Sequence, residues 1–266
     1  MKLLILGEQG MLGQMAFRYF SDKAGFTVAT LKMRYDLTNH KEFIQHINAH
    51  HADVVLNCVG LIKQHRPAAK HLYDINARLP GSLAIGLDSG TVLVHPSTDC
   101  IFNGTQEVMY DLAQAPDAED DYGISKSMGE LAVALRPKTL LIRTSIIGPD
   151  KRLNGLGLMA WFMRQARGTR VNGYTNHFWN GVTTLEWCKI VSSLLEEARH
   201  YKHAYVIQPG LIQPVSKYEL LVHMNRIFNR GVEVYPHEDV HRINRSLWPN
   251  LAATSIEQQL QELLAI

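Results

Sequence analysis

The stretch that decides the fold is residues 2–13, KLLILGEQGMLG. KLLILG predicts a buried strand, and a helix is predicted over residues 10–20. Between them stand Gly7, Gly10 and Gly13, in a G-x-x-G-x-x-G pattern. Glycines at such a turn permit a sharp change of direction, let backbone N–H groups approach a phosphate, and let the helix pack close to the strand. We therefore expect a strand–loop–helix unit whose helix N-terminus faces a pyrophosphate.

Outward from this loop, apolar strands alternate with segments of helical periodicity. Strands are predicted at residues 26–31, 52–60, 91–98 and 138–145, and helices at residues 40–50, 70–88 and 122–135. This alternation indicates an α/β fold, in which helices cover both faces of a doubly wound parallel sheet.

The periodicity weakens after the fifth strand, and residues 149–180 are irregular. Further elements are predicted as helices at residues 184–199, 216–228 and 254–265 and as a strand at residues 204–208. We therefore expect residues 1–148, completed by about 181–208, to form the sheet domain. Residues 149–180 and 209–266 are expected to form a small, interleaved C-terminal lobe.

Four helix starts are predicted from capping boxes, in which a short polar side chain precedes a Glu by three residues. The four pairs are Asn39–Glu42, Thr183–Glu186, Ser216–Glu219 and Thr254–Glu257. Each pair would satisfy two of the backbone N–H groups that a helix start leaves without an acceptor.

The composition excludes several classes of protein. The 266 residues are 46% hydrophobic, and a net charge of +2 gives no electrostatic reason to expect nucleic acid or an anionic membrane surface as a partner. No apolar run is long enough to cross a membrane, and the first strand leaves no room for a signal peptide. Cys58, Cys100 and Cys188 are odd in number and lack a C-x-x-C, and the thirteen histidines lack an H-E-x-x-H. We therefore expect a cytoplasmic protein with no disulfide framework and no metal site.

Basic residues follow the second predicted strand, where a dinucleotide site often carries an acid. Lys32 and Arg34 occupy this stretch, and cations there suit the 2′-phosphate of NADPH better than the free hydroxyl of NADH. The alternative is that both are plain surface charges. Asp36 follows slightly later and could serve the adenine edge.

Tyr122 and Lys126 lie four residues apart near the start of a predicted helix, so they share one helix face. An ammonium group close to a phenol lowers its pKa, and such a tyrosine can exchange a proton with a substrate oxygen near neutral pH. Tyr19 and Lys23 have the same spacing, but they lie most of a helix away from the carboxyl edge of the sheet. Thr98 ends the fourth strand beside the start of the Tyr122 helix, and this convergence favours an active site there.

Together these motifs resemble the extended short-chain dehydrogenase/reductases, and most of all the dTDP-4-dehydrorhamnose reductase family. The resemblance is carried by Gly7-x-x-Gly10-x-x-Gly13, Asn57-Cys58-Val59-Gly60, Ser97-Thr98-Asp99, Tyr122-Gly-Ile-Ser-Lys126 with Gly129-Glu130, and Arg143-Thr-Ser. It covers residues 1 to about 150, and more loosely Asn180–Thr184 and Arg245–Leu247. It implies a Rossmann fold with a small substrate lobe, and reduction of a 4-keto nucleotide sugar with NADPH or NADH, as in dTDP-rhamnose and polysaccharide biosynthesis.

The resemblance also implies roles for individual residues. Thr98, Tyr122 and Lys126 would be catalytic. With Lys32 and Arg34, the expected cofactor contacts are Gly7, Gly10, Met11, Leu12, Gly13, Asp36, Leu37, Cys58, Val59, Gly60, Tyr122 and Lys126. The candidates to contact the nucleotide sugar are Asp99, Trp179, Asn180 and Arg245, because a nucleotide diphosphate needs cations and a ring-stacking surface.

Two features differ from the family pattern. The chain is short for an extended member, and Cys100 stands where an aromatic residue often follows Thr-Asp. One alternative function is an epimerase or dehydratase of the same fold, which would want an acid–base pair after Thr98. The other is a regulatory subunit that binds a cofactor without catalysis, although the intact Thr98, Tyr122 and Lys126 argue against it. A homodimer is the expected assembly.

Overall fold

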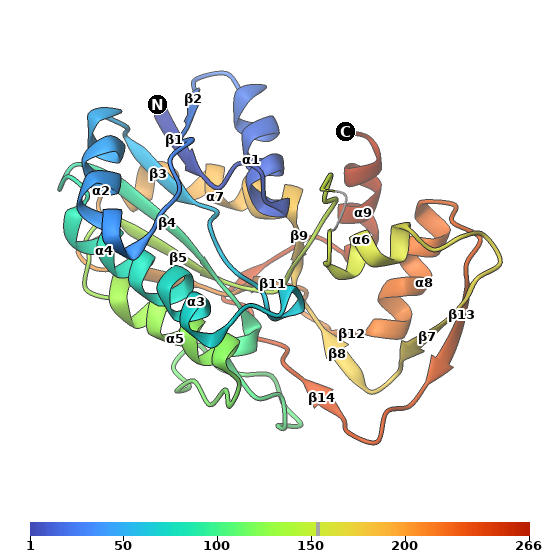
Figure 1. Cartoon of the computed structure of the whole chain (residues 1–266). Coiled ribbons are helices and arrows are strands. Elements are labelled where there is room, and N and C mark those ends of the chain that lie inside the picture. The colour runs from blue at the N-terminus through green and yellow to red at the C-terminus, as the bar shows by residue number, and fades with distance from the viewer. Residues whose placement is uncertain (153–154) are drawn as a thin grey trace.

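The computed structural model describes residues 1–152 and 155–266. Its centre is a six-stranded sheet in which all neighbouring strands are parallel (Figure 1). Across the sheet the strands are β10 (Tyr205–Ile207), β5 (Thr139–Arg143), β4 (Val92–Ser97), β3 (Val54–Asn57), β1 (Lys2–Leu6) and β2 (Thr27–Thr30). The predicted doubly wound α/β fold is confirmed.

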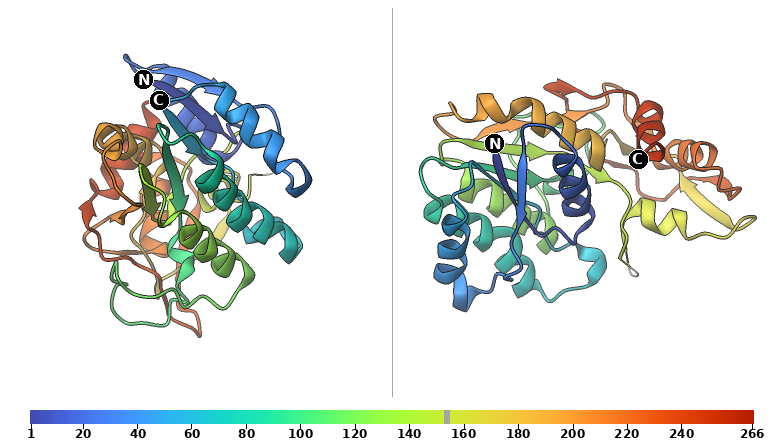
Figure 2. Two further views of the ribbon diagram at one scale, coloured as in Figure 1. Left: turned by 90° about the vertical axis from the view of Figure 1, so that its left-hand side faces the viewer. Right: turned by 90° about the horizontal axis from the view of Figure 1, so that it is seen from above.

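The strands are apolar along their whole length because both faces of the sheet are buried. Successive residues of β1 enter two different cores: Leu3 and Ile5 join one, and Leu4 and Leu6 join the other. The first core is covered by helices α1 (Met11–Ser21) and α7 (Thr184–Ala198). The second is covered by α2 (His40–Ala49), α4 (Leu79–Gly86) and α5 (Asp121–Val133), as Figure 2 shows from two further sides.

The helix predicted over residues 70–88 is interrupted. It consists of α3 (Ala69–Tyr73), a π-helical turn η3 (Asp74–Arg78), and α4. Pro80 explains the interruption, because it has no N–H to donate to the carbonyl of Asn76 and its ring would clash with that carbonyl in a regular helix. The displaced carbonyl reaches α5 at Gly129, where any Cβ would collide with it. This segment therefore brings Asn76 to the edge of the sheet where the strands end.

Two of the predicted capping boxes hold at least in part. At α8 (Lys217–Ile227), the Ser216 hydroxyl accepts from the Glu219 N–H at 3.1 Å, and the Glu219 carboxylate accepts from the Ser216 N–H at 2.7 Å. At α7, Thr183 accepts from the Glu186 N–H at 3.2 Å. The Glu186 carboxylate does not return this bond and accepts instead from Thr254 at 3.4 Å.

The other two boxes were predicted at the wrong residues. Asp36 and Asn39 form a box around the 3-10 turn η1 (Leu37–Asn39), so Asn39 is already used when α2 begins. The helix α9 (Ile256–Leu264) is capped by Ser255, because Thr254 is turned toward Glu186. In both cases a neighbouring polar residue offers the same kind of cap with a better-placed side chain.

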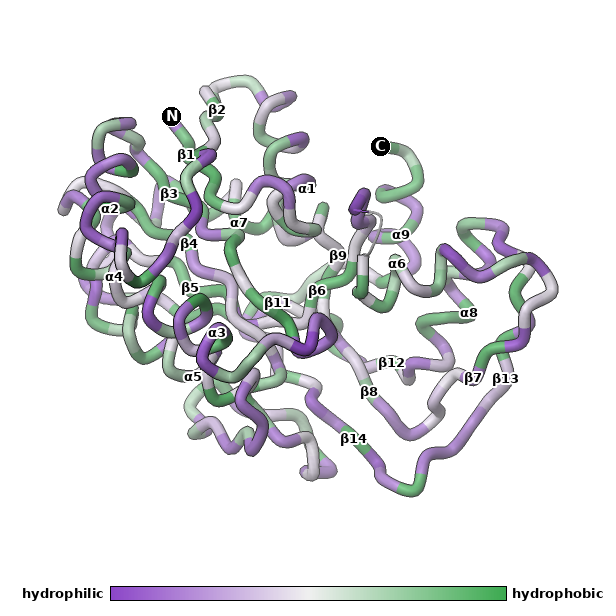
Figure 3. The backbone as a smooth tube through the Cα atoms, viewed as in Figure 1, coloured by the Kyte–Doolittle hydropathy of each residue, from purple (hydrophilic) through white to green (hydrophobic). Residues whose placement is uncertain are grey.

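The second half of the chain adds smaller pieces beside the sheet (Figure 1). They are α6 (Leu158–Met163), the three-stranded sheet β12 (Val215–Ser216), β8 (His177–Trp179) and β14 (Ile243–Asn244), and the strand pairs β13 (Glu233–His237) with β7 (Arg170–Tyr174), β6 (Ile146–Ile147) with β9 (Val182–Thr183), and β11 (Pro209–Gly210) with β15 (Leu251–Ala252). From β13 round to β14 the chain is mostly hydrophilic (Figure 3).

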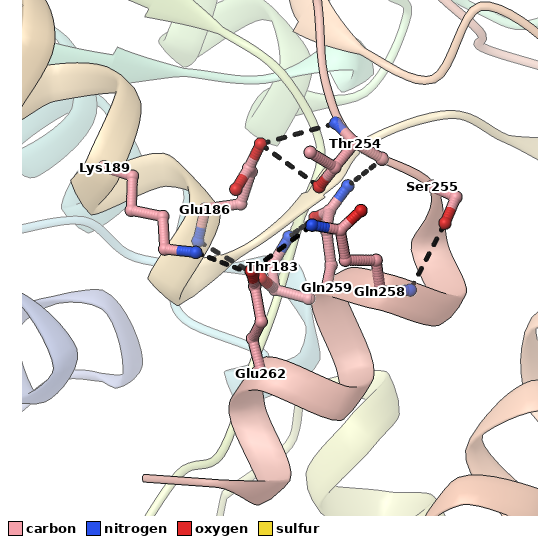
Figure 4. Close-up of polar contacts among 8 residues, drawn as sticks. All are labelled: Thr183, Glu186, Lys189, Thr254, Ser255, Gln258, Gln259 and Glu262. Carbon is pink, nitrogen blue, oxygen red and sulfur yellow. Dashed lines mark hydrogen bonds and ion pairs between the residues drawn. The ribbon is translucent and has the colours of Figure 1, made fainter.

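Helix α9 is fastened to α7 by the polar contacts drawn in Figure 4. The buried Gln259 accepts from the Thr183 N–H at 2.8 Å and donates to the Thr254 carbonyl at 2.7 Å. Lys189 and Glu262 add an ion pair of 2.7 Å at the rim. The C-terminal helix therefore joins the smaller elements to the helix that covers the main sheet.

Candidate active site

The candidate site lies at the carboxyl edge of the main sheet. The chain runs from β1 out to the edge strand β2 and then returns to β3 on the other side of β1, so the winding direction changes between β1 and β3. Open α/β sheets bind their ligands at the carboxyl ends of the strands next to such a point. The ends of β1, β3 and β4 carry Gly7, Cys58 and Thr98.

The structure gives a different account of why glycine stands at each of the three positions in the first loop. Gly7 has a φ of +76°, which disfavours any side chain, and a Cβ there would lie 3.0 Å from the Val59 nitrogen. A Cβ on Gly13 would collide with the Gly7 carbonyl oxygen, so this glycine permits the close packing of α1 on the loop. A Cβ on Gly10 would meet nothing closer than 3.4 Å. Packing therefore requires glycine at positions 7 and 13 but leaves Gly10 unexplained.

The start of α1 is open to an anion. Gly10 is its N-cap residue, no side chain accepts from its first N–H groups, and its first turn contains no acidic residue. These N–H groups have no acceptor within the helix, and the helix dipole adds positive potential at the same place. Met11, Leu12 and Gly13 contribute the first turn. The loop has room and donors for a pyrophosphate, and a phosphate that approached there would account for a glycine at position 10.

The stretch after β2 lies at the predicted adenosine end. Lys32 and Arg34 are exposed and have no ion pair within the described parts of the chain. The Asp36 carboxylate accepts from the Thr38 N–H at 2.9 Å and from the Thr38 hydroxyl at 2.6 Å, and this hydrogen bonding lowers its pKa. Its side chain thus serves the local turn, and the neighbouring Leu37 is exposed.

The loop after β3 lies against the glycine loop. The Val59 N–H donates to the Asn57 side chain at 3.2 Å, and Val59 would lie 3.0 Å from a Cβ on Gly7. Cys58 packs against the first core, and burial raises the pKa of its thiol. Gly60 is exposed beside the Asn76 side chain. Cys58, Val59 and Gly60 therefore line the path from the glycine loop toward α5.

Thr98, Tyr122 and Lys126 are brought together where β4 ends and α5 begins. Thr98 is buried, and its hydroxyl donates to Asp99 at 3.0 Å and accepts from the Cys100 N–H at 3.1 Å. A Cβ on Gly123 would collide with the Cys100 carbonyl, so this glycine allows the start of α5 to approach the segment after β4. Lys126 is buried, and its ammonium donates to the Pro96 carbonyl at 2.7 Å.

The pKa of Tyr122 differs from the sequence-based expectation. Burial, followed by the negative charges around it, raises its pKa above the usual value, whereas the Thr98 side chain acts in the opposite direction. Burial lowers the pKa of Lys126 to about 8. The prediction of a lowered Tyr122 pKa is wrong for this arrangement, because desolvation outweighs the influences that favour the phenolate. Tyr122 therefore holds its proton at neutral pH.

Several buried polar residues around the triad were missed from the sequence. The Asn76 side chain accepts from the Leu61 N–H and donates to the Leu61 carbonyl, both at 3.0 Å, and donates to Ser125 at 3.2 Å. His95 is bonded to Asn57 at 3.2 Å, and burial holds its pKa well below the usual value. The available signal was an Asn or His inside an otherwise apolar strand or helix.

The predicted substrate residues fall into two groups. Asp99 and Arg245 lie close together: the Arg245 guanidinium donates to the carbonyls of Phe102 and Asn103 at 2.8 and 3.1 Å, and its charge opposes the effect of burial, which raises the Asp99 pKa. Trp179 belongs instead to the first core, which leaves its ring little surface for stacking. Asn180 is buried with its amide bonded to the backbone of Leu211 and Leu247.

The described residues contain neither a metal-binding cluster nor a helix suited to a membrane. Over residues 1–152 and 155–266, no group of three or more His, Cys, Asp or Glu side chains is arranged to hold a metal ion. Over the same residues, no helix has the length and apolar character needed to cross a bilayer. The candidate site therefore consists of the glycine loop, the triad and the charged groups next to it.

Comparison with curated proteins gives matches over about half of this chain. A dTDP-4-dehydrorhamnose reductase of Aggregatibacter actinomycetemcomitans is 28% identical over 149 residues, which are 54% of this chain and 51% of that protein. The chain spans about half the length of the curated relatives it matches.

Solved structures match over almost the whole chain. A dTDP-4-dehydrorhamnose reductase from Bacillus anthracis in complex with NADP has a TM-score of 0.82 at 20% identity, over 99% of this chain and 98% of that one. A dTDP-glucose 4,6-dehydratase from the same organism, in complex with NAD, has a TM-score of 0.76 at 14% identity, over 100% and 96% of the two chains. At these identities the likeness establishes the fold.

The family model described as RmlD substrate binding domain matches residues 1–173, which is well over half of the chain. The match contains the glycine loop, the end of β4 and the start of α5, which are the parts that build the candidate site. The chain belongs to the RmlD substrate-binding-domain family.

Proposed function

We propose that this chain is an NAD(P)H-dependent oxidoreductase that reduces the 4-keto group of a nucleotide-linked deoxysugar, with NADPH as the preferred cofactor. The observation that carries the proposal is the meeting of Thr98, Tyr122 and Lys126 beside a glycine loop that is open to a pyrophosphate. The name of the Aggregatibacter relative and the NADP in the Bacillus anthracis structure support the same reading.

The cofactor contacts follow from the geometry of the loops. Met11 and Leu12 would hold the pyrophosphate with backbone N–H groups, and Gly10, whose own N–H donates to the Gly7 carbonyl at 3.0 Å, would leave room for it. Lys32 and Arg34 would bind the 2′-phosphate. Val59 and Gly60 would line the path toward the nicotinamide, whose ribose would meet Lys126. The cofactor supplies a hydride when bound. The protein's own part is to orient the carbonyl and to deliver a proton.

Tyr122 is the proton donor in this mechanism. Its raised pKa keeps the phenol protonated at neutral pH, which is the form that reduction requires. The proton passes from the Tyr122 oxygen to the sugar oxygen as negative charge develops there. The Lys126 ammonium stabilises the phenolate that remains, and the Thr98 hydroxyl turns from Asp99 to donate to the same sugar oxygen.

The side chains at the site favour reduction over the reactions of other enzymes with this fold. Structures named as reductase and as dehydratase both superpose on this chain, so overall likeness does not choose between them. A dehydratase needs an acid and a base beyond the tyrosine. Here Asp99 is followed by Cys100, and burial raises the pKa of this thiol to about 12. Cys100 is therefore a poor base near neutral pH.

The proposed division of labour has two parts. Residues 1–148, with about 181–208, bind the cofactor; β10 from the second range pairs with β5 of the first. Residues 149–180 and 209–266, of which 153–154 lie outside the described part of the chain, bind the substrate. Within this lobe Arg245 touches the sugar nucleotide together with Asp99, whereas Trp179 and Asn180 support the lobe from inside.

The test is a screen of nucleotide sugars with NADPH, followed as loss of the reduced nicotinamide absorbance. Turnover of a 4-keto deoxysugar nucleotide by the wild-type chain is the expected result. Arg245→Ala should raise the KM of the sugar nucleotide more than that of NADPH. Absence of turnover across dTDP-, UDP- and GDP-linked keto sugars, in a chain that still binds NADPH, would contradict the proposal.

We also infer a homodimer in the cytoplasm. Ile85 of α4, Leu131 of α5 and Leu135 in the turn after α5 are 91, 77 and 88% exposed, and Met128 also lies on α5. Large apolar side chains gathered on adjacent helices are typical of an interface. Leu131→Glu with Leu135→Glu should give a monomer in sedimentation analysis, and a wild-type chain that already sediments as a monomer would exclude the dimer.

The free cysteines suit a reducing compartment such as the cytoplasm.

A further inference from the structure

We propose that Lys217 is the residue that binds the diphosphate of the substrate, acting as a second cation beside Arg245. This inference rests on the proposed function and adds a contact that none of the sequence motifs pointed to. Lys217 lies far from the triad in the sequence, at the start of α8, and it reaches the candidate site through the small three-stranded sheet.

The small sheet places Lys217 and Arg245 on the two sides of its central strand. Ser216 of β12 and Asn244 of β14 both pair with Phe178 of the central strand β8, one on each side. Because β12 runs antiparallel and β14 parallel to β8, Lys217 continues toward the level of His177 and Arg245 toward that of Trp179. Both lie beside His177, whose pKa their charges lower after the larger effect of burial.

This sheet is fastened to the segment that follows Thr98. Arg245 donates to the carbonyls of Phe102 and Asn103, and the side chains of Ile243 and Arg245 pack against Gly104, where a Cβ would lie 2.9 Å from Arg245. The charges of Lys217 and Arg245 both act on Asp99, the neighbour of Thr98. The two cations therefore stand next to the place where the triad would hold a carbonyl.

The position of Lys217 is unfavourable unless something binds it. It is partly buried, and its ammonium has no hydrogen bond or ion pair within residues 1–152 and 155–266. It also occupies the first residue of α8, where the helix dipole disfavours a cation. Burial is the main cause that lowers its pKa; the charge of Asp99 acts in the opposite direction, and the charges of Arg245 and Lys63 add to the lowering. An anion between Lys217 and Arg245 would relieve all of these costs.

The balance of charge leaves room for such an anion. Lys63, whose charge also acts on Lys217, is paired with Asp120 at 3.0 Å. Asp99 offsets one of the two remaining cations, so Lys217 and Arg245 together keep about one uncompensated positive charge. Arg245 already uses Nε and Nη2 on backbone carbonyls, which holds its guanidinium in place. Lys217, as a flexible point charge, can follow the phosphates of different nucleotides.

The test is calorimetric titration of dTDP, UDP and inorganic pyrophosphate into the wild-type chain, Lys217→Met and Lys217→Arg. A lost charge-assisted contact is expected to weaken nucleoside diphosphate binding about 10- to 100-fold in Lys217→Met. Lys217→Arg keeps the charge and should remain within about threefold. The matched control is Lys202→Met, an exposed lysine before β10 at the opposite edge of the sheet, which should bind like wild type.

NADPH titration of each variant separates a local effect from general damage, and Lys217→Met should keep the wild-type affinity for NADPH. Wild-type diphosphate affinity in Lys217→Met, equal loss in Lys202→Met, or no diphosphate binding by the wild-type chain would each overturn the assignment. The two proposals can fail separately. Diphosphate binding that depends on Lys217 without turnover of any keto sugar removes the reductase and keeps the anion site. Turnover with a KM indifferent to Lys217 does the reverse.

Discussion

The two edges of the main sheet carry the same local motif with different surroundings. At the amino edge, Tyr19 and Lys23 lie four residues apart near the end of α1, with the Lys23 ammonium donating to the Tyr19 hydroxyl at 3.2 Å in an exposed position. At the carboxyl edge, Tyr122 and Lys126 have the same spacing near the start of α5. There the ammonium is buried and bonded to the Pro96 carbonyl.

The exposed pair has the contact that sequence spacing predicts, and the pair proposed to be catalytic does not. The carboxyl edge differs in its neighbouring groups, because Thr98, the segment after β4 and the open start of α1 lie there. Water screens the charges at the amino edge, whereas burial shifts both pKa values at the carboxyl edge. Spacing thus identifies a helix face, and topology decides whether that face can do chemistry.

The largest expected effect comes from removing one hydroxyl at each edge. Tyr122→Phe should lower kcat about 10²–10⁴-fold, because the proton for the sugar oxygen must then come from water. Tyr19→Phe should stay within about twofold, since an exposed substitution away from the site costs little. Steady-state kinetics on the sugar nucleotide found in the screen measures both. If Tyr19→Phe is the inactive variant, the site has been placed at the wrong edge.

The next effect compares glycines at the two edges. Gly10→Val should weaken NADPH binding by about 100-fold or more, because a branched side chain would occupy the space of the pyrophosphate and cost at least one charge-assisted contact. Gly90→Val is the control: Gly90 precedes β4 at the amino edge and a Cβ there meets nothing within 4 Å. Fluorescence titration with NADPH measures the affinity, and equal affinities in the two variants would argue against a cofactor at the glycine loop.

The sequence predicts the sheet edge better than it predicts the contacts made there. Continuous apolar runs are enough to locate the six strands, because parallel strands buried on both faces are apolar along their whole length. The glycine loop and Thr98, Tyr122 and Lys126 follow from motif and place. The role of Trp179 does not, because an aromatic side chain has the same appearance in a sequence whether it lines a site or fills a core.

Other features depend on contacts between distant segments. The π-helical turn at Asn76 requires knowing that Gly129 lies opposite its carbonyl. In the sequence Lys217 is an ordinary helix residue, and only the folded chain brings its charge near that of Arg245. The pKa of Tyr122 depends on how deeply the side chain is buried, which spacing along a helix does not report.

A smaller effect tests the adenosine end of the carboxyl edge. The double variant Lys32→Ala, Arg34→Ala should reduce the preference for NADPH over NADH about 10- to 100-fold, because it removes the cations available to a 2′-phosphate. Affinity for NADH should change little, which separates phosphate recognition from loop damage. A wild-type ratio of the two affinities in the double variant would identify Lys32 and Arg34 as ordinary surface charges.

The smallest effect is a pH dependence that the amino-edge pair should lack. The pKa of Lys126 is lowered to about 8, so raising the pH through this value removes its positive charge in the free enzyme. The charged form is the one that stabilises the Tyr122 phenolate, and kcat/KM reports the free enzyme. We therefore expect kcat/KM for reduction to be level below about pH 8 and to fall up to about tenfold per pH unit above it.

Two lysine variants test which residue causes this fall in kcat/KM above about pH 8, the basic limb of the pH profile. Lys126→Arg, which keeps its charge across the range, should remove the limb near pH 8 even though its activity is lower, because guanidinium does not titrate there. Lys23→Arg should leave both the limb and its position unchanged, since Lys23 only contacts an exposed phenol. A limb that persists in Lys126→Arg belongs to another group, and one that moves in Lys23→Arg would mean that the two edges are electrostatically coupled. Exposed charges are screened over a Debye length of ~10 Å at 0.1 M salt. A limb that moves in Lys23→Arg is therefore the less compatible of the two results with this fold.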